Sequence, residues 1–154
     1  MAAGSVLLYD TLAKYLMNGT VDLDAGNVNL ALVTSSYTPD EVNDALWSSV
    51  SGNEIAAANG YSAGGIALAS PVFAAITKGF KFSSANPAWT ASGGSIAAWR
   101  YGVFYVNATV NSVVKPLIGY FLGDATPADV PATTDTNVLT VACPSGGWFD
   151  MTRP

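Results

Sequence analysis

The sequence has 154 residues, which suits one domain, because two domains of half that length would each have a marginal hydrophobic core. Half of the residues are hydrophobic and only 11% are charged, whereas soluble domains average about 25%. The net charge of −5 argues against nucleic acid as a ligand, because phosphate binding needs clustered lysine and arginine. We therefore predict a single domain over residues 1–154 that does not bind nucleic acid.

The few charges are unevenly distributed along the chain. Residues 1–54 have a net charge of −6, residues 55–123 contain four cations and no acid, and residues 124–154 have a net charge of −3. Complementary potentials of this kind can orient identical subunits towards each other, although chance explains the segregation equally well. The low charge content also implies apolar surface that a partner covers.

The N-terminal segment is predicted to form a helix. Leu8, Leu12 and Leu16 recur every four residues and create an apolar stripe. Ser5 is the candidate N-cap, and Asn18-Gly19 is a typical C-terminal stop. We expect this helix to cover one face or edge of a sheet.

A strand and a second helix are expected next. Apolar residues alternate with other residues in 28–32, which predicts a strand with one buried face. The segment 38–41 resembles the start of a helix, because a threonine cap and a proline at the first helical position precede two acids. We expect a short helix that reaches Trp47, followed by a loop over residues 48–65.

Strand patterns dominate from Ile66 onward. Short apolar runs separated by proline and glycine occupy 66–68, 72–76, 80–82 and 88–90, and two closing strands occupy 138–143 and 148–151. An exposed excursion rich in proline, threonine and aspartate is expected over 125–135.

The segment 96–106 is apolar on both strand faces. One face carries Ile96, Phe104 and Val106, and the other carries Trp99, Tyr101, Val103 and Tyr105. Such a strand is covered on both sides, by another sheet, by the N-terminal helix or by a neighbouring subunit, and 117–122 has the same character. We predict a mainly β fold, an antiparallel β-sandwich or partly closed barrel with an N-terminal α-helix and one short helix.

An uncharged stretch over 55–77 is long enough to span a membrane. It contains Asn59-Gly60, Gly64-Gly65 and Pro71, which would break a helix into pieces shorter than a bilayer requires. We therefore predict no membrane span.

The pentapeptide Gly60 to Gly64 (GYSAG) matches the nucleophile elbow of serine hydrolases, with Ser62 as the nucleophile. That chemistry requires a strand before the serine, a helix after it and a histidine to accept its proton. The sequence contains no histidine and a β-like run follows Ser62, so we interpret the match as a structural turn. A pairing of Ser62 with Lys78 or Lys81 is the remaining alternative. We predict no catalytic residue.

Asp22 and Asp24 offer oxygen ligands of the kind that calcium prefers. The glycine and the distal glutamate of a calcium loop are missing at the required spacing, so a plain turn is favoured and cation binding by the two aspartates stays open. With no histidine and one cysteine, Cys143, we predict no zinc or iron site, no cofactor and no disulfide within the chain.

Several aromatic residues are candidates for contact with a partner. Aromatic side chains dominate both cores and interfaces, and they also stack on sugars. We favour core or interface roles over a carbohydrate platform. The interface candidates are Trp89, Trp99, Tyr101, Tyr105 and Tyr120.

The order of five motifs resembles a family of small tailed-bacteriophage virion structural proteins. The motifs are 30–40 (LALVTSSYTPD), 46–55 (LWSSVSGNEI), 60–65 (GYSAGG), 100–105 (RYGVFY) and 116–120 (PLIGY). The resemblance runs over nearly the whole chain and implies a virion component with no enzymatic residues.

The expected function follows from this resemblance and from the low charge content. We expect a capsid decoration, or cement, protein that is made in the host cytoplasm, forms a homo-oligomer and binds the major capsid protein on the outer surface of the shell. The alternative is a receptor- or glycan-binding module of a tail or head fibre that uses exposed tryptophan and tyrosine.

Overall fold

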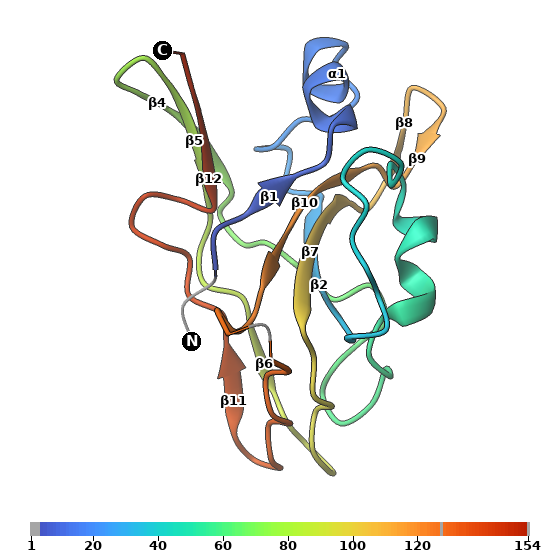
Figure 1. Ribbon diagram of the computed structural model, residues 1–154. Helices are drawn as coiled ribbons and strands as arrows, with labels where there is room; N and C mark the ends of the chain where they lie inside the picture. Colours follow the sequence, from blue (N-terminus) through green and yellow to red (C-terminus); the bar gives the residue numbers. More distant parts are fainter. Residues whose placement is uncertain (1–3, 127, 154) are drawn as a thin grey trace.

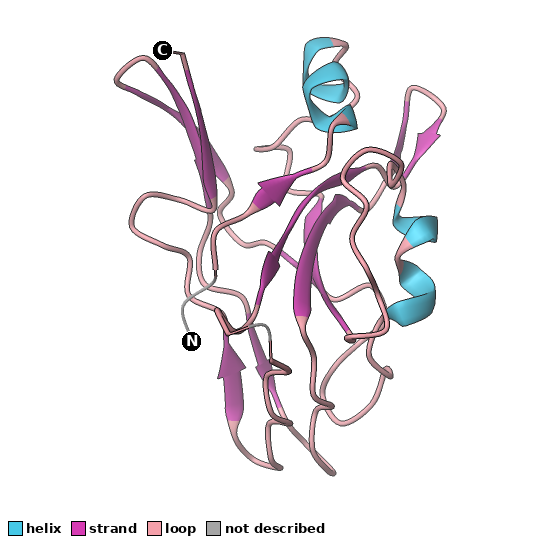
Figure 2. Ribbon diagram, in the orientation of Figure 1, coloured by secondary structure: helices cyan, strands magenta, loops and turns pink. Residues whose placement is uncertain are grey.

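The structure is a computed structural model that describes residues 4–126 and 128–153, and it consists mainly of antiparallel strands (Figure 1 and Figure 2). A central sheet has the strand order β1–β10–β7–β2–β3. Its strands are β1 (Leu7–Leu8), β2 (Val28–Val33), β3 (Ile66–Ala67), β7 (Tyr101–Val106) and β10 (Leu117–Leu122).

Smaller sheets and short helices surround the central sheet. One has the order β12–β5–β4 and is built from β4 (Val72–Ile76), β5 (Gly79–Ser83) and β12 (Phe149–Thr152). Two strand pairs are β6 (Ala88–Thr90) with β11 (Val138–Thr140), and β8 (Thr109–Val110) with β9 (Val113–Val114). The helices are α1 (Thr11–Met17) and the one-turn 3-10 helices η1 (Trp47–Ser49) and η2 (Ser51–Asn53). These sheets form a sandwich-like arrangement and do not close into a barrel.

Both faces of the central sheet are buried. On one face lies the main core, where β2, β7 and β10 pack against β5, β6, β11 and β12 through residues that include Leu30, Phe104, Phe121, Phe82, Trp89 and Phe149. On the other face lies the tyrosine core, which contains Tyr9, Ala31, Val33, Tyr37, Trp47, Val50, Val103, Tyr105, Leu117 and Tyr120. Figure 1 shows the sheet of β4, β5 and β12 on one side of β10, β7 and β2 and the 3-10 helices on the other. The predicted two-sided coverage of β7 and β10 is confirmed.

The prediction of one buried face for the strand at 28–32 is wrong. All six residues of β2 are buried, and even Asn29 is only 7% exposed. Its side-chain amide donates to the carbonyl oxygen of Gly64 at 2.9 Å, which compensates for burying a polar group. Alternation of polar and apolar residues misled the prediction because the polar member has its own partner inside the fold.

The two predicted helices differ from those in the structure. Residues 7–8 form β1 and the helix begins only at Thr11, so Ser5 is not its N-cap, whereas Asn18 and Gly19 end it as predicted. The second helix does not start at residue 38. The carboxylate of Asp40 instead accepts hydrogen bonds from the backbone N–H groups of Val42 and Asn43 and closes a turn, which competes with helix formation.

The predicted strand at 96–106 is regular only from Tyr101 onward. Ile96 and Trp99 form isolated bridges to Thr133 and Val130, and both side chains lie in the main core. The assignment of Trp99 to the face of Tyr101 is therefore wrong, because strict alternation holds only within a continuous strand. The excursion at 125–135 is exposed at most of its described residues, as predicted, although Val130 within it is 5% exposed.

The predicted short strands at 66–68, 72–76, 80–82 and 88–90 and both closing strands are present, with bounds that differ by a few residues. Within the described residues, no helix is long and apolar enough to cross a membrane.

Candidate binding site

An irregularity in β10 turns Tyr120 towards the tyrosine core. Leu117 pairs with Tyr105, but Gly119 pairs with Phe104, so the register shifts by one residue between them. Such a bulge adds a residue to one strand and reverses the faces beyond it. Leu117 and Tyr120 therefore lie on the same face although they are three positions apart.

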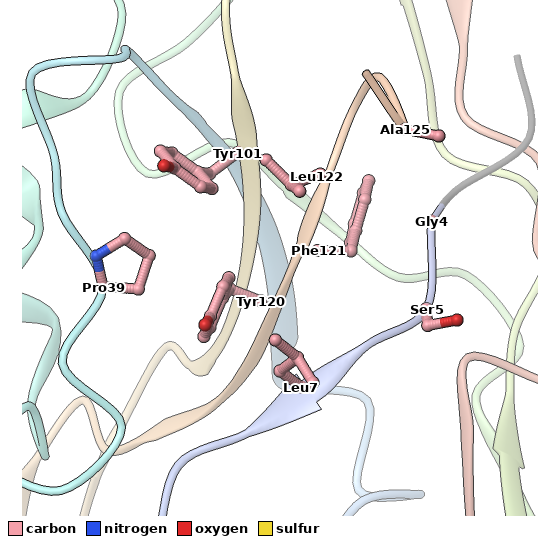
Figure 3. Close-up of a pocket in the computed structure, with 9 residues that line it drawn as sticks. All are labelled: Gly4, Ser5, Leu7, Pro39, Tyr101, Tyr120, Phe121, Leu122 and Ala125. Atoms are coloured by element: carbon pink, nitrogen blue, oxygen red, sulfur yellow. The ribbon is translucent and has the colours of Figure 1, made fainter. Parts of the chain in front are cut away.

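The bulge places Tyr120 beside an apolar pocket of about 440 Å³ (Figure 3). We call this cavity the tyrosine pocket. Its lining residues are Gly4, Ser5, Leu7, Pro39, Tyr101, Tyr120, Phe121, Leu122 and Ala125. The volume falls within the range of about 300 to 1,000 Å³ typical of ligand sites.

Aromatic rings form one wall of the tyrosine pocket. The rings of Tyr101 and Tyr120 meet edge to face with centroids 6.1 Å apart. Figure 3 shows Pro39 facing these two rings, with Leu7 next to Tyr120 and Phe121 on the opposite side of the β10 ribbon. Leu7 is 49% exposed, so the pocket opens onto an apolar rim.

The loop that carries Pro39 is held in place by hydrogen bonds between tyrosines and acids. The hydroxyl of Tyr120 donates to Oε1 of Glu41 at 2.8 Å. The hydroxyl of Tyr37 donates to Oδ2 of Asp44 at 2.7 Å and accepts from Tyr9 at 2.7 Å. These charge-assisted bonds fasten the loop over the tyrosine core and fix one wall of the pocket.

The hydroxyls of these tyrosines stay protonated at neutral pH. Burial is the main reason that the pKa values of Tyr9, Tyr37 and Tyr120 lie well above the usual value near 10. Hydrogen bonds to carboxylates raise the pKa values of Tyr37 and Tyr120 further. Of these three tyrosines, Tyr120 lines the pocket, so its neutral ring and the apolar residues beside it suit recognition of an apolar side chain.

The sequence-predicted interface residues fall into two groups. Trp89, Trp99 and Tyr105 are 4%, 1% and 0% exposed and belong to the interior of this chain. Tyr105 stacks on Trp47 with ring centroids 4.4 Å apart. Tyr101 is half-buried, and it lines the tyrosine pocket with Tyr120. Tyr120 is 8% exposed, so of the five candidates Tyr101 is the best placed to meet a partner.

Ser62 lies in a turn. The backbone N–H of Gly65 donates to the carbonyl oxygen of Ser62 at 3.0 Å, and β3 follows immediately. This context has no helix after the serine, as the sequence predicted. Lys78 and Lys81 lie on the β4–β5 hairpin, and no hydrogen bond joins either to Ser62 in the described part of the chain.

Asp22 and Asp24 form a close pair, in which the backbone N–H of Asp24 donates to Oδ1 of Asp22 at 3.3 Å. A hydrogen bond to the Asp24 side chain raises the pKa of the Asp22 carboxyl. Residues 4–126 and 128–153 contain no group of three or more potential metal ligands among histidine, cysteine, aspartate and glutamate. Cys143 is a free thiol that is partly buried.

Sequence reasoning missed Leu7 and Pro39 as parts of the pocket and Glu41 as the hydrogen-bond partner of Tyr120. It placed residue 7 within the N-terminal helix and used Pro39 and Glu41 to start another. A partial signal was present, because a buried tyrosine hydroxyl such as that of Tyr120 needs a partner and the acids within residues 40–44 include that partner, Glu41.

Comparison of the chain with protein-family models, with curated proteins and with solved structures finds no match.

Proposed function

We propose that this protein is a structural component of a tailed-phage virion, a decoration or cement protein that binds the outer surface of the capsid. The observation that carries the proposal is the tyrosine pocket with its exposed rim at Leu7. The resemblance of the ordered sequence motifs to phage structural proteins is the reason for proposing a virion. The pocket is the reason for proposing contact with an apolar side chain of the major capsid protein.

The arrangement of the cores supports a role that depends on a rigid body. The central sheet is packed on both faces, so its strands cannot shift without disturbing two cores. The loop beside the pocket is fixed by partly buried hydrogen bonds from Tyr37 and Tyr120. A preformed surface loses little entropy on binding, which favours a clamp.

A cement protein stabilises a shell by binding the assembled state in preference to free subunits. The test compares particles that contain the protein with particles that lack it. We expect the former to resist heat and osmotic shock better, with a copy number close to that of the major capsid protein. Equal robustness, or only a handful of copies per particle, would contradict the proposal.

A variant identifies the contact surface. Leu7→Ser removes the apolar rim of the tyrosine pocket, and Val138→Ser is the matched control because Val138 is 56% exposed on β11. The binding partner is a capsid assembled without this protein. We expect Leu7→Ser to bind such capsids at least tenfold more weakly than the wild type, and the control to bind as the wild type does. Equal binding of both variants would exclude the pocket as the contact.

The alternative is a glycan-binding module, and Tyr101 is the observation that favours it, since its half-buried ring lines an open pocket. The tryptophans cannot serve this role in the described structure, because Trp47, Trp89, Trp99 and Trp148 are between 1% and 6% exposed. Binding to a glycan array that Tyr101→Ala abolishes would favour this alternative.

A further inference from the structure

We propose that the outer edge of β4 pairs antiparallel with β4 of a second copy of this chain, around a two-fold axis at Ala74. This inference names a surface through which copies of the protein would form the homo-oligomer that the sequence predicts, and it rests on the proposed function only to this extent.

The outer edge of β4 is unpaired. β4 lies at the end of the three-stranded sheet with β5 as its one neighbour, and Figure 1 shows the β4–β5 hairpin projecting from the body of the molecule. No backbone hydrogen bond outside the pairing with β5 involves residues 72–76, within the described parts of the chain. An open row of backbone donors and acceptors is a template for another strand.

The other strand edges are less suited to pairing. β1 and β3, at the two edges of the central sheet, have two residues each. β12, at the opposite edge of the small sheet, contains Asp150 and is followed by Arg153, and charged residues of this kind discourage edge pairing. β4 has five residues and no charge, and Val72 is 47% exposed.

The sequence of β4 is complementary to itself. When two copies meet at Ala74, Val72 lies opposite the partner's Ile76, and Phe73 lies opposite the partner's Ala75. Branched residues thus meet branched residues, and the aromatic ring meets a small residue, so no like charges or bulky rings face each other directly. An isologous contact of this kind requires just such a self-complementary surface.

The aromatic side chains next to β4 fit the same arrangement. Phe73 and Phe80 stack with ring centroids 5.2 Å apart, and Phe80 is 49% exposed. Ala75 pairs with Phe80 within the sheet, so the small Ala75 would lie between Phe80 and the partner's Phe73. The second copy would therefore cover part of an exposed ring.

Charge does not oppose the pairing. Lys81 is the charged residue of β5, and the two copies of Lys81 would be about 14 Å apart across three strand spacings. That distance exceeds the screening length of about 8 Å at physiological ionic strength. Asp150 also lies opposite Lys81 in the register of β12 and β5.

The contact is small, because a five-residue strand buries much less than the roughly 800 Å² per partner of a stable complex. We therefore expect weak dimers in solution. A lattice of bound copies raises the local concentration and strengthens the contact.

Sedimentation of the purified chain from about 1 µM to about 1 mM tests the inference without any capsid. We expect the apparent mass of the wild type to rise from 15.8 kDa towards twice that value. Ala74→Glu should weaken the dimer at least tenfold, because two carboxylates meet at the axis while each faces its own Lys81. Val138→Glu, the same charge change at another exposed strand position, should dimerise as the wild type does.

Cysteine cross-linking tests the register. In a Cys143→Ala background, Ala74→Cys should form an intermolecular disulfide readily, because opposed Cα atoms about 5 Å apart permit the bond. Ala75→Cys should cross-link at least tenfold more slowly, since the two positions are offset along the strands. A wild type that stays monomeric at the highest concentration, an unaffected Ala74→Glu variant, or equal cross-linking at both positions would overturn the inference. None of these results bears on whether the protein binds capsids, which the comparison of particles with and without the protein tests independently.

Discussion

Removal of one hydroxyl group, by Tyr61→Phe, should destabilise this fold strongly. β3 pairs with β2 only at Asn29 and Leu30, and beside Leu32 the backbone of Ile55 donates to the Leu32 carbonyl oxygen but leaves the Leu32 N–H without a backbone partner. The Tyr61 hydroxyl takes the place of a neighbouring strand there and accepts a hydrogen bond from the backbone N–H of Leu32 at 3.0 Å. It donates in turn to Oε1 of Glu54 at 2.7 Å.

The magnitude follows from the two bonds that are lost. A hydrogen bond to a charged acceptor contributes about 1.5–3 kcal/mol, and an unpaired buried N–H costs about 1–3 kcal/mol. Leu32 is 0% exposed, so water cannot replace the lost partner. We expect Tyr61→Phe to lower the free energy of unfolding by about 2.5–6 kcal/mol.

The assay is urea denaturation followed by tryptophan fluorescence, which is suitable because the tryptophans are buried. Tyr101→Phe is the matched control, since its hydroxyl has no hydrogen-bond partner in the described residues, and it should change the stability by less than about 0.5 kcal/mol. A double-mutant cycle with Glu54→Gln should show a coupling of about 1 kcal/mol or more. If Tyr61→Phe and Tyr101→Phe have equal effects and the cycle shows no coupling, the hydroxyl does not close the sheet.

Three further predictions concern pH and glycine. Burial raises the pKa of Tyr105 to about 12, and the other buried tyrosines shift upward as well, so stability should be constant up to about pH 10 and then fall as unfolded tyrosines ionise first. At pH 11 each such tyrosine should lower the free energy of unfolding by about 1.4 kcal/mol relative to neutral pH. Denaturation at several pH values measures this loss, and a denaturation midpoint at pH 11 equal to that at neutral pH would contradict it. Gly102→Ala should cost about 2 kcal/mol or more in the same assay, because an added Cβ would lie 2.2 Å from the Phe121 ring; Phe121→Leu in the same chain should restore part of the loss. Gly65→Ala should prevent folding, as seen by circular dichroism, since Gly65 has a φ of 70° and an added Cβ would lie 1.9 Å from the carbonyl oxygen of Leu30; a folded variant of normal stability would refute this.

The strand content was predictable because apolar runs separated by proline and glycine leave few alternatives. The run 117–122 and the two-sided pattern near 101–106 identify the central strands without any knowledge of their partners. Burial on both faces also follows, because a strand that is apolar on both faces needs cover on both. The nature of that cover did not follow, since the segment 34–55 reads as polar loop and helix but contributes Tyr37 and Trp47 to the tyrosine core.

The candidate site was harder to predict because it depends on contacts between distant parts of the chain. The direction of Tyr120 is set by the bulge after Leu117, and a one-residue shift in register leaves no trace in hydrophobic periodicity. The loop that carries Glu41 satisfies helix-start rules locally, yet the Asp40 carboxylate closes a turn there, and Glu41 accepts the hydrogen bond of the Tyr120 hydroxyl from that turn.

The pairing of β1 with β10 has a consequence for how the chain reaches its native state. Leu7 lies beside Tyr120, and Phe82 pairs with Phe149, so the sheets are completed by segments far apart in the sequence. Contacts of such long range form only after large loops have closed, and the entropy lost on closing these loops is not compensated until the contacts exist. Folding is therefore slow, typically milliseconds to seconds. β12 can join β5 only after the ribosome has released residues 149–152, so the small sheet is completed late in the order of synthesis of the described residues.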